Sequence, residues 1–456
     1  MVAWTDFAPP LSRKMTTVPV SRIGRHFMES IALLTILVVM IMLGAPVGFT
    51  MILIPVVYIL ITDAAPMILI PSQMFQAIDS VPLTAIPFFM LTGELMTSAT
   101  ITDRLVDLSR RIIGRMRGSM AQANVLVSMF FAGMNGSVVA DTATVGSLLV
   151  PGMKKAGYPP EFAAAITAVS STIGGIIPPS IMMIILANAA GISVGALFAG
   201  GIVPGLMIGG LLMVINYVIA RRRNFERSEE PFSLKGIAVA SYRSSFALLI
   251  PIVLVGSVVF GIAGVVEAGA LTATIALVVG VFIYRTITWT NCKSALVRAF
   301  RSSALVFIII AASGPFSWLL TSLGAIGQLE EWLLGYTYNP FVFALVLVLF
   351  ICLLGMVMDS AANIIVVGPV LVDVMVKAGY PDVQAALVVV VGFLIGSVTP
   401  PVGVAFFTAG AIAEVRLEKV AIAMLPYLAA LFVLLFVLII VPDFTMYLPR
   451  VLGFGG

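Results

Sequence analysis

The sequence contains very little histidine and cysteine. Its only histidine is His26, in a polar N-terminal segment, and its two cysteines, Cys292 and Cys352, lie far apart. A disulfide framework and a cysteine zinc site are therefore excluded, because both need several cysteines at defined spacings. The HExxH and Walker A motifs are also absent. These absences argue against a metalloprotease, a haem-ligating subunit and a histidine-dependent hydrolase, so we do not expect an enzyme.

Charged residues are scarce as well. They make up 10% of the 456 residues, whereas 61% are hydrophobic, and the mean hydropathy is +1.15. A soluble domain carries about 25% charged residues, so this composition is typical of a chain surrounded by lipid. The Lys and Arg residues occur in short clusters between apolar runs, which is the pattern of cytoplasmic loops rather than of a nucleic-acid-binding face. We therefore expect an all-α, polytopic membrane protein with no nucleic-acid partner.

Several apolar runs are long enough for a spanning helix of roughly 20 residues. They lie near residues 83–99, 193–220, 245–265, 267–284, 302–322 and 421–442. The stretch 30–62 is too long for one simple span and is interrupted at Gly44-Ala45-Pro46, so it is either two short spans or one kinked span. The basic tail 1–29 precedes a long apolar run, which favours a signal anchor over a cleaved signal peptide.

The distribution of positive charge predicts two re-entrant hairpins. Basic clusters flank residues 119–153 on both sides, so this segment starts and ends on the cytoplasmic face. Two arms of about 16 residues reach only ~24 Å each, which is short of a ~30 Å hydrocarbon core. We expect a hairpin with its tip at Asn135-Gly136-Ser137. By the same reasoning, residues 341–377 enter from the opposite face and turn near Asp359-Ser360.

An internal repeat relates these two segments. Lys155-Ala156-Gly157-Tyr158-Pro159 recurs as Lys377-Ala378-Gly379-Tyr380-Pro381. The shift that carries Lys155 to Lys377 also relates, without gaps, many other Gly and Pro positions, including Pro178-Pro179 and Pro400-Pro401. Related segments of opposite orientation are the inverted-repeat signature of secondary transporters.

Each repeat places a Pro-Pro pair in a predicted helix after its hairpin. Proline removes a backbone donor and clashes with the preceding turn, so both helices must open within the membrane. Opened backbone is tolerated in a bilayer only where it is buried in protein or lines a cavity. The breaks are therefore either packing kinks or sites where free carbonyls bind a cation and helix N-termini face an anion.

Asp141 and Asp359 lie beside the two predicted hairpin tips at membrane depth. An ionised carboxylate there is costly unless it is paired or bound to an ion, which makes each a functional candidate. The alternative is that each caps the second arm of its hairpin. The two are not equivalent in the repeat, because Asp141 aligns with Asn363 and Asp359 aligns with Ser137.

The chain resembles the large membrane subunit of tripartite ATP-independent periplasmic (TRAP) transporters over nearly its whole length from about residue 30. The matching motifs are 85–94 (AIPFFMLTGE), 135–141 (NGSVVAD), 170–180 (SSTIGGIIPPS), 199–205 (AGGIVPG), 399–403 (TPPVG) and 447–449 (YLP). Asn135 departs from this family's pattern, which usually has serine there.

The resemblance implies an inverted-repeat, elevator-type transporter with two hairpins and two Pro-Pro-broken helices, in the bacterial inner membrane. It also implies a small four-helix membrane subunit, a periplasmic substrate-binding protein, a small organic-acid substrate and coupling to sodium, with no other cofactor. The predicted sodium ligands surround the hairpin tips and helix breaks. They are Asn135, Gly136, Ser137, Asp141, Thr172, Gly174, Pro178, Asp359, Ser360, Asn363, Gly396, Thr399 and Pro400.

The resulting division of the chain has six parts. They are a tail (1–29), scaffold spans with an amphipathic connection (30–118), a first repeat (119–220), a basic loop with scaffold spans (221–340), a second repeat (341–445) and a C-terminal tail (446–456). Two alternatives stay open, namely a self-sufficient sodium- or proton-coupled anion transporter and a membrane-embedded enzyme.

Overall fold

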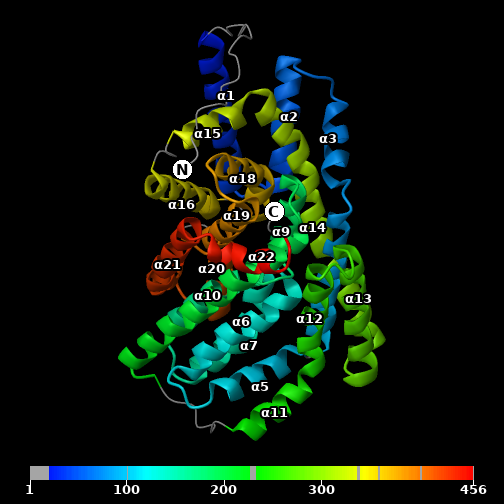
Figure 1. The fold of residues 1–456 in the computed structure, drawn as a ribbon, viewed down its shortest axis with the longest axis vertical. Coiled ribbons are helices and arrows are strands. Elements are labelled where there is room, and N and C mark those ends of the chain that lie inside the picture. Colours follow the sequence, from blue (N-terminus) through cyan, green and yellow to red (C-terminus); the bar gives the residue numbers. More distant parts are fainter. Residues whose placement is uncertain are drawn as a thin grey trace, which may run out of the picture.

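The structure, a computed structural model, describes residues 20–99, 101–225, 233–335, 339–357, 360–400 and 403–454. All regular elements in these ranges are helices (Figure 1). The predicted all-α fold class is therefore confirmed. Asp359 and residues 401–402, which the sequence places at the second tip and the second break, lie outside the described residues.

Several helices in the described ranges are long and apolar enough to cross a membrane. Four qualify singly: α10 (Val194–Arg222), α13 (Val265–Val278) with its π-helical extension η3 (Val279–Ile283), α14 (Trp289–Ser322) and α21 (Leu417–Ile440). Three bent pairs raise the number to as many as seven where each pair forms one span rather than a re-entrant loop. They are α3 (Leu69–Ile78) with η1 (Pro82–Thr84) and α4 (Ala85–Ser98), α11 (Leu234–Arg243) with α12 (Ser245–Val259), and α17 (Ser360–Val366) with α18 (Gly368–Lys377). The chain is a multi-pass membrane protein.

The long apolar stretch near the N-terminus forms two helices. They are α1 (Val20–Met42) and α2 (Val47–Thr62), and the chain reverses between them (Figure 1). Gly44 permits this turn because it adopts a φ of +90°, which other residues rarely adopt, and Pro46 then precedes the first residue of α2. Of the two possibilities for residues 30–62, the two-helix arrangement is the one found.

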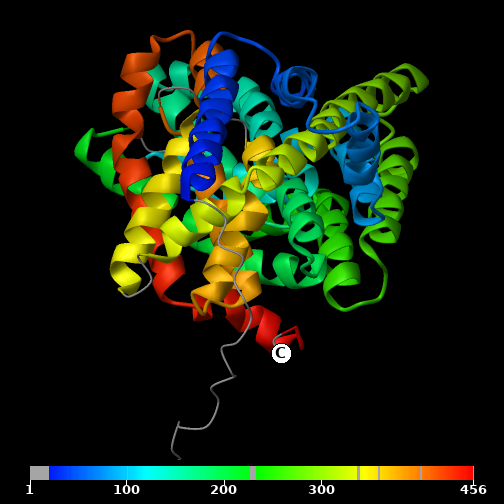
Figure 2. The same ribbon diagram turned by 90° about the horizontal axis from the view of Figure 1, so that it is seen from above.

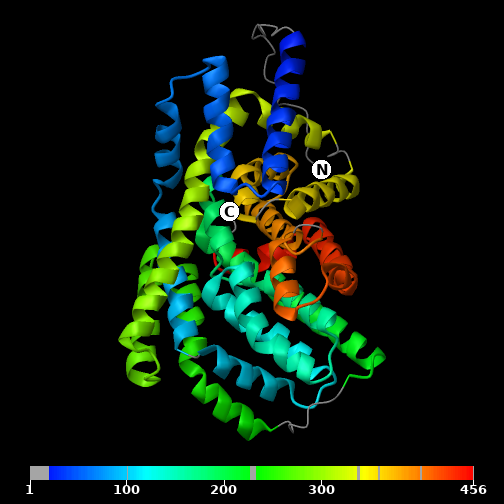
Figure 3. The ribbon, with the colours of Figure 1, turned by 180° about the vertical axis from the view of Figure 1, so that it is seen from behind.

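Five helices form a flank of the molecule: α2, α3, α4, α13 and α14 (Figures 1 and 3). Glycines allow them to pack closely. A Cβ atom on Gly314 in α14 would lie 2.3 Å from the carbonyl oxygen of Gln73 in α3, and one on Gly269 in α13 would lie 3.0 Å from the ring of Phe89 in α4. Seen from above, α13 lies at the edge of the molecule, and α14 runs from the middle of the molecule out to the same side (Figure 2). We call these five helices the flank.

The remaining helices form a central group around the two repeats. The first hairpin is α6 (Ser119–Asn135) and α7 (Val138–Lys155), and the first broken helix is α8 (Pro160–Ser171), η2 (Thr172–Gly175) and α9 (Ile181–Ala190). The second hairpin is α16 (Pro340–Val357), α17 and α18, and the second broken helix is α19 (Asp382–Gly396) and α20 (Val404–Ala413). The tip predicted at residues 135–137 and the break at Pro178-Pro179 are both found. At about 26 Å, the 17-residue α6 is shorter than a hydrocarbon core.

The repeat is visible in the backbone as well as in the sequence. Gly157 and Gly379 have φ values of +80° and +94°. A Cβ atom on either residue would meet nothing within 4 Å. After each glycine a tyrosine N–H donates to a methionine carbonyl at 3.0 Å, from Tyr158 to Met153 and from Tyr380 to Met375. Two helices therefore end in the same way at equivalent positions of the repeat, and the next helices begin at Pro160 and Asp382, which are equivalent as well.

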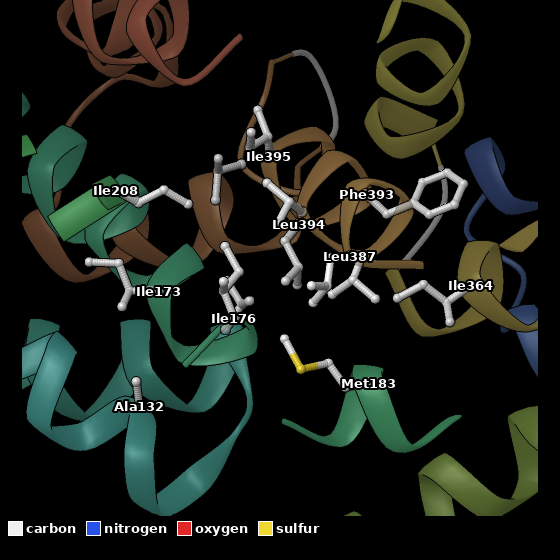
Figure 4. Close-up of a cluster of buried hydrophobic side chains, with 14 of the residues drawn as sticks. Ala132, Ile173, Ile176, Met183, Ile208, Ile364, Leu387, Phe393, Leu394 and Ile395 are labelled. Carbon is white, nitrogen blue, oxygen red and sulfur yellow. The ribbon is translucent and has the colours of Figure 1, made fainter. Parts of the chain in front are cut away.

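The hydrophobic core of the central group lies between the two broken helices. Side chains from η2 and α9 of the first repeat and from α19 of the second, among them Met183, Leu387 and Leu394, meet in one cluster (Figure 4). A Cβ atom on Gly175 would lie 2.7 Å from the Leu394 side chain, so this glycine allows the two repeats to touch. The core therefore packs the segments that precede the two breaks against each other. The six-part division of the chain stays a prediction.

Candidate functional site

The tip of the first hairpin rests directly on the first helix break. Gly136 has a φ of +60°, and a Cβ atom there would lie 2.6 Å from the carbonyl oxygen of Pro179 and 3.1 Å from the nitrogen of Ile181. Ser137 and Ser180 begin the helices on either side of this contact. Their hydroxyls accept from backbone N–H groups, at 3.5 Å from Ala140 and 3.3 Å from Met183 respectively. Two helix N-termini, those of α7 and α9, are thereby positioned by the same contact.

Asp141 lies in the first turn of α7 and is only 1% exposed. Its Oδ2 accepts a hydrogen bond from Ser128 Oγ at 2.8 Å, whereas its Oδ1 is buried with no hydrogen-bond partner among the described residues. The N-terminus of α7 favours a negative charge nearby. A buried carboxylate oxygen without a partner nevertheless costs on the order of 1–3 kcal/mol, and more when the group is charged. Asp141 is therefore incompletely compensated by the protein itself.

Gly174 lies in η2, just before the break, and brings this part of the first broken helix against Asp141. A Cβ atom on Gly174 would lie 3.5 Å from the Cβ of Asp141 and 3.6 Å from the carbonyl oxygen of Ser137. Pro178 also lies beside the hairpin. A Cβ atom on Gly133 would lie 3.8 Å from the carbonyl oxygen of Pro178. Five of the predicted ligand positions, Gly136, Ser137, Asp141, Gly174 and Pro178, are thus brought to one place.

Two other positions predicted near this break are not shown to contact Asp141. Thr172 donates its hydroxyl to the carbonyl oxygen of Val169 at 2.7 Å, within its own helix. The side chain of Asn135 lies outside the described residues, although its backbone ends α6.

A chain of buried polar side chains stands behind Asp141. Ser128 Oγ is 3.3 Å from Ser170 Oγ, Ser170 donates to Asn124 Oδ1 at 2.8 Å, and Asn124 Nδ2 donates to Thr167 Oγ1 at 2.9 Å. All four residues are at most 1% exposed. Asn124, Ser128 and Thr167 are not predicted from the sequence. The available signal was the i, i+4 spacing of Asn124 and Ser128 in an apolar hairpin arm.

Predicted residues of the second repeat contact the backbone of α16 and α19. Ser360 donates to the carbonyl oxygen of Phe393 at 3.2 Å, and Thr399 to that of Ile395 at 2.7 Å. A Cβ atom on Gly355 would lie 2.7 Å from the Cα of Gly396, so α16 and α19 touch backbone to backbone.

Asn363 and Pro400 complete the second set. Asn363 Nδ2 donates to the carbonyl oxygen of Leu354 at 3.2 Å, so its amide faces backbone where Asp141 faces a serine. Pro400 follows Thr399 at the end of a described range. The second site therefore consists mainly of neutral groups, as far as the described residues define it.

The groups at the first site are the oxygen atoms of a carboxylate, hydroxyls and carbonyls. Such ligands suit a hard cation rather than a transition metal. In the described ranges, no cluster of three or more His, Cys, Asp or Glu residues is placed to hold a metal. With one carboxylate and several neutral oxygens, the arrangement suits a cation of low charge.

Comparison with known proteins gives consistent results. A family profile described as "Tripartite ATP-independent periplasmic transporter, DctM component" matches residues 34–444. A sialic acid TRAP transporter large permease protein from Vibrio cholerae is 31% identical over 90% of this chain and 96% of its own length. A C4-dicarboxylate TRAP transporter large permease protein from Pseudomonas aeruginosa is 32% identical over 80% of this chain and 86% of its own.

A solved structure shares the fold. The YdaH transporter of Alcanivorax borkumensis superimposes with a TM-score of 0.59 over 81% of this chain and 86% of its own, at 16% identity. The relatives named above are transporter permeases, not enzymes.

Proposed function

The chain belongs to the DctM component family of tripartite ATP-independent periplasmic transporters, and from that premise we propose that it is the translocating subunit of a sodium-coupled importer of small organic acids. In this proposal it lies in the bacterial inner membrane. It works with a small four-helix membrane subunit and a periplasmic binding protein that delivers the substrate. The observation that carries the coupling is Asp141, a buried carboxylate with one unpartnered oxygen beside a broken helix.

Sodium fits the groups that surround Asp141. The unpartnered Oδ1 supplies one ligand atom, and the carbonyl of Ser137 next to Gly174 supplies the kind of neutral oxygen that a hard cation prefers. Sodium, when bound, supplies a positive charge that compensates this buried carboxylate. The protein's own contribution is to hold the tip against the break, so that carboxylate and carbonyls are already gathered before the ion arrives.

An organic acid is the substrate class that the relatives and the helix geometry favour together. The two relatives are named for sialic acid and for C4-dicarboxylates, both of which carry carboxylates. In this chain the N-termini of α7 and α9 are held together by the contact between Gly136 and Pro179. Free N–H groups at helix N-termini bind anions. We place the substrate carboxylate near these N-termini.

Movement of the central group against the flank is the mode of transport we propose. Contacts between the two include apolar side chains, with Ala312 and Phe316 of α14 in one cluster with Ala362 of α17. Apolar contacts have no directional bonds to break, so they permit sliding at low cost. A hydrogen bond from Ser80 to Asn188 joins the segment before η1 to α9. We expect this bond to be remade or lost as the central group moves.

Uptake into proteoliposomes tests the proposal. The chain is reconstituted with its small membrane subunit, and radiolabelled organic acids are offered with and without the cognate binding protein. An inward sodium gradient is compared with a choline control and with a proton gradient at equal membrane potential. Uptake that requires both sodium and the binding protein supports the proposal.

Two other results would overturn parts of it. Uptake that is indifferent to the binding protein would identify a self-sufficient carrier. Uptake driven by protons alone would transfer the role of Asp141 from ion binding to proton carriage.

A further inference from the structure

The polar chain behind Asp141 has a fixed hydrogen-bond direction. The Thr167 hydroxyl gives its single proton to the carbonyl oxygen of Ala163 at 2.8 Å, so its oxygen accepts from Asn124 Nδ2. This orients the Asn124 amide with Oδ1 toward Ser170, which donates to it at 2.8 Å.

The Ser128 proton is then committed to Asp141. The Ser170 hydroxyl has two acceptors, Asn124 Oδ1 at 2.8 Å and the carbonyl oxygen of Thr167 at 3.2 Å. With its single proton given to either, Ser170 can only accept from Ser128, at 3.3 Å. The carboxylate of Asp141 is the nearer acceptor, at 2.8 Å, and a charge-assisted hydrogen bond is the stronger one. Oδ2 is therefore held by Ser128, and Oδ1 is the atom left without a partner.

The second repeat lacks this chain. In the register that aligns Lys155 with Lys377, the equivalents of Asn124, Ser128, Thr167 and Ser170 are Val346, Phe350, Val389 and Gly392. None of these four has a polar side chain, and Phe350 packs against Trp332, with ring centroids 6.2 Å apart. The second repeat also lacks the carboxylate at this position, because the equivalent of Asp141 is Asn363. The repeat that has a charged group at this position also has the donors that orient it.

We infer that Ser128 is a positioning residue for ion coupling. It fixes Oδ2 of Asp141 so that Oδ1 faces the coupling cation. Ser170 offers the Ser128 hydroxyl only a more distant acceptor, so it does not displace this bond. Among the residues that the structure describes, the oriented carboxylate therefore belongs to the first repeat. This inference rests on the proposed function, because it assumes that a cation binds Asp141.

Sodium-dependent melting of the purified protein tests the inference apart from transport. A ligand that binds the folded state raises the melting temperature according to its concentration relative to its dissociation constant. Each variant is melted in detergent in increasing sodium chloride, with choline chloride keeping the ionic strength constant. The reference for each variant is its own melting temperature in choline, so a general loss of stability is subtracted.

We expect Ser128→Ala to raise the sodium concentration for half-maximal stabilisation about tenfold, because residues that orient a metal ligand contribute about 10- to 100-fold to affinity. Ser128→Thr keeps the hydroxyl and should restore most of the sodium response. Ser170→Ala removes only the more distant acceptor of Ser128 and should leave the sodium response close to that of the wild type.

Ser303→Ala is the matched control. Ser303 is a buried serine of α14 whose hydroxyl donates to the carbonyl oxygen of Ala299 at 2.8 Å, within its own helix. It should leave the sodium response unchanged. In uptake assays, Ser128→Ala should raise the apparent KM for sodium more than it lowers the maximal rate.

The possible failures can be told apart. If the wild-type protein shows neither sodium-dependent melting nor sodium-dependent uptake, the proposed function fails. If the wild type responds to sodium and Ser128→Ala responds at the same concentrations, this inference alone is wrong. Equal losses in Ser128→Ala and Ser128→Thr would also overturn it, because a lost hydroxyl could not then be the cause.

Discussion

Gly136 and Pro179 touch backbone to backbone, because a Cβ atom on Gly136 would lie 2.6 Å from the carbonyl oxygen of Pro179. The tip of the first hairpin thus leaves no room for a side chain against the broken helix. The contact joins the two segments that the sequence marks separately, one by its Asn-Gly-Ser turn and one by its Pro-Pro pair.

Gly136→Ala should therefore destabilise the protein strongly. Two effects lower the free energy of unfolding. The positive φ of an alanine costs about 1 kcal/mol, and overpacking against a carbonyl oxygen costs about 1–3 kcal/mol. Gly191→Ala is the control, since Gly191 has a similar φ of +69° with open space around it. Melting temperatures of the two variants should differ clearly, with Gly136→Ala the lower. Equal losses would mean that the hairpin tip tolerates movement away from Pro179.

Gly355→Ala should disturb the second repeat by the same mechanism. A Cβ atom on Gly355 would lie 2.7 Å from the Cα of Gly396, and neither backbone can yield as a flexible side chain could. We expect a loss of about 1–3 kcal/mol in the free energy of unfolding. Gly210→Ala in α10 is the matched control, because it also lies inside a helix but meets nothing within 4 Å. That change should be neutral or stabilising by up to about 1 kcal/mol.

Sequence reasoning located the first hairpin tip and the first helix break, and the reason is local chemistry. Gly136 is needed for a positive φ, and Pro178 and Pro179 cannot continue a helix wherever they stand. The hairpin topology followed from basic clusters and from arms too short to cross a bilayer. These signals do not depend on what packs against the segment.

The polar chain behind Asp141 was not predicted, because it depends on how helices turn toward each other. Asn124 and Ser128 stand in α6, whereas Thr167 and Ser170 stand in α8, with the whole of α7 between them along the chain. Small polar residues in an apolar helix are common at helix–helix packing contacts. Only the tertiary arrangement shows which of them meet.

Tyr427→Phe should destabilise the central group. The Tyr427 hydroxyl in α21 donates to Asn216 Oδ1 in α10, and both residues are fully buried. Removing the hydroxyl leaves the Asn216 oxygen without this donor, at a cost of about 1–3 kcal/mol. Tyr447→Phe, at a residue that is 62% exposed, should change the melting temperature little. A comparable loss in both variants would contradict a specific role for the buried bond.

Asn363→Asp tests the asymmetry of the repeats from the second side. Asn363 donates to the carbonyl oxygen of Leu354, and an ionised carboxylate cannot donate. The new charge would be buried, and the second repeat has no equivalent of Ser128 to compensate it. We expect a loss of about 3 kcal/mol or more, seen as a lower melting temperature in choline. A variant as stable as the wild type would show that the second repeat can hold a carboxylate unaided.

Asp141→Asn is the reciprocal change, and we expect it to act in the opposite way. The amide oxygen can still accept the hydrogen bond from Ser128, so the geometry of the first site is kept while its charge is removed. Because an incompletely compensated charge no longer has to be buried, the melting temperature in choline should stay unchanged or rise. The additional stabilisation by sodium should be lost, since the neutral side chain no longer attracts a cation. Melting curves in sodium and in choline measure both effects in one experiment. A variant that keeps the full sodium-dependent rise would place the coupling ion away from Asp141 and would leave this carboxylate as a cap of α7.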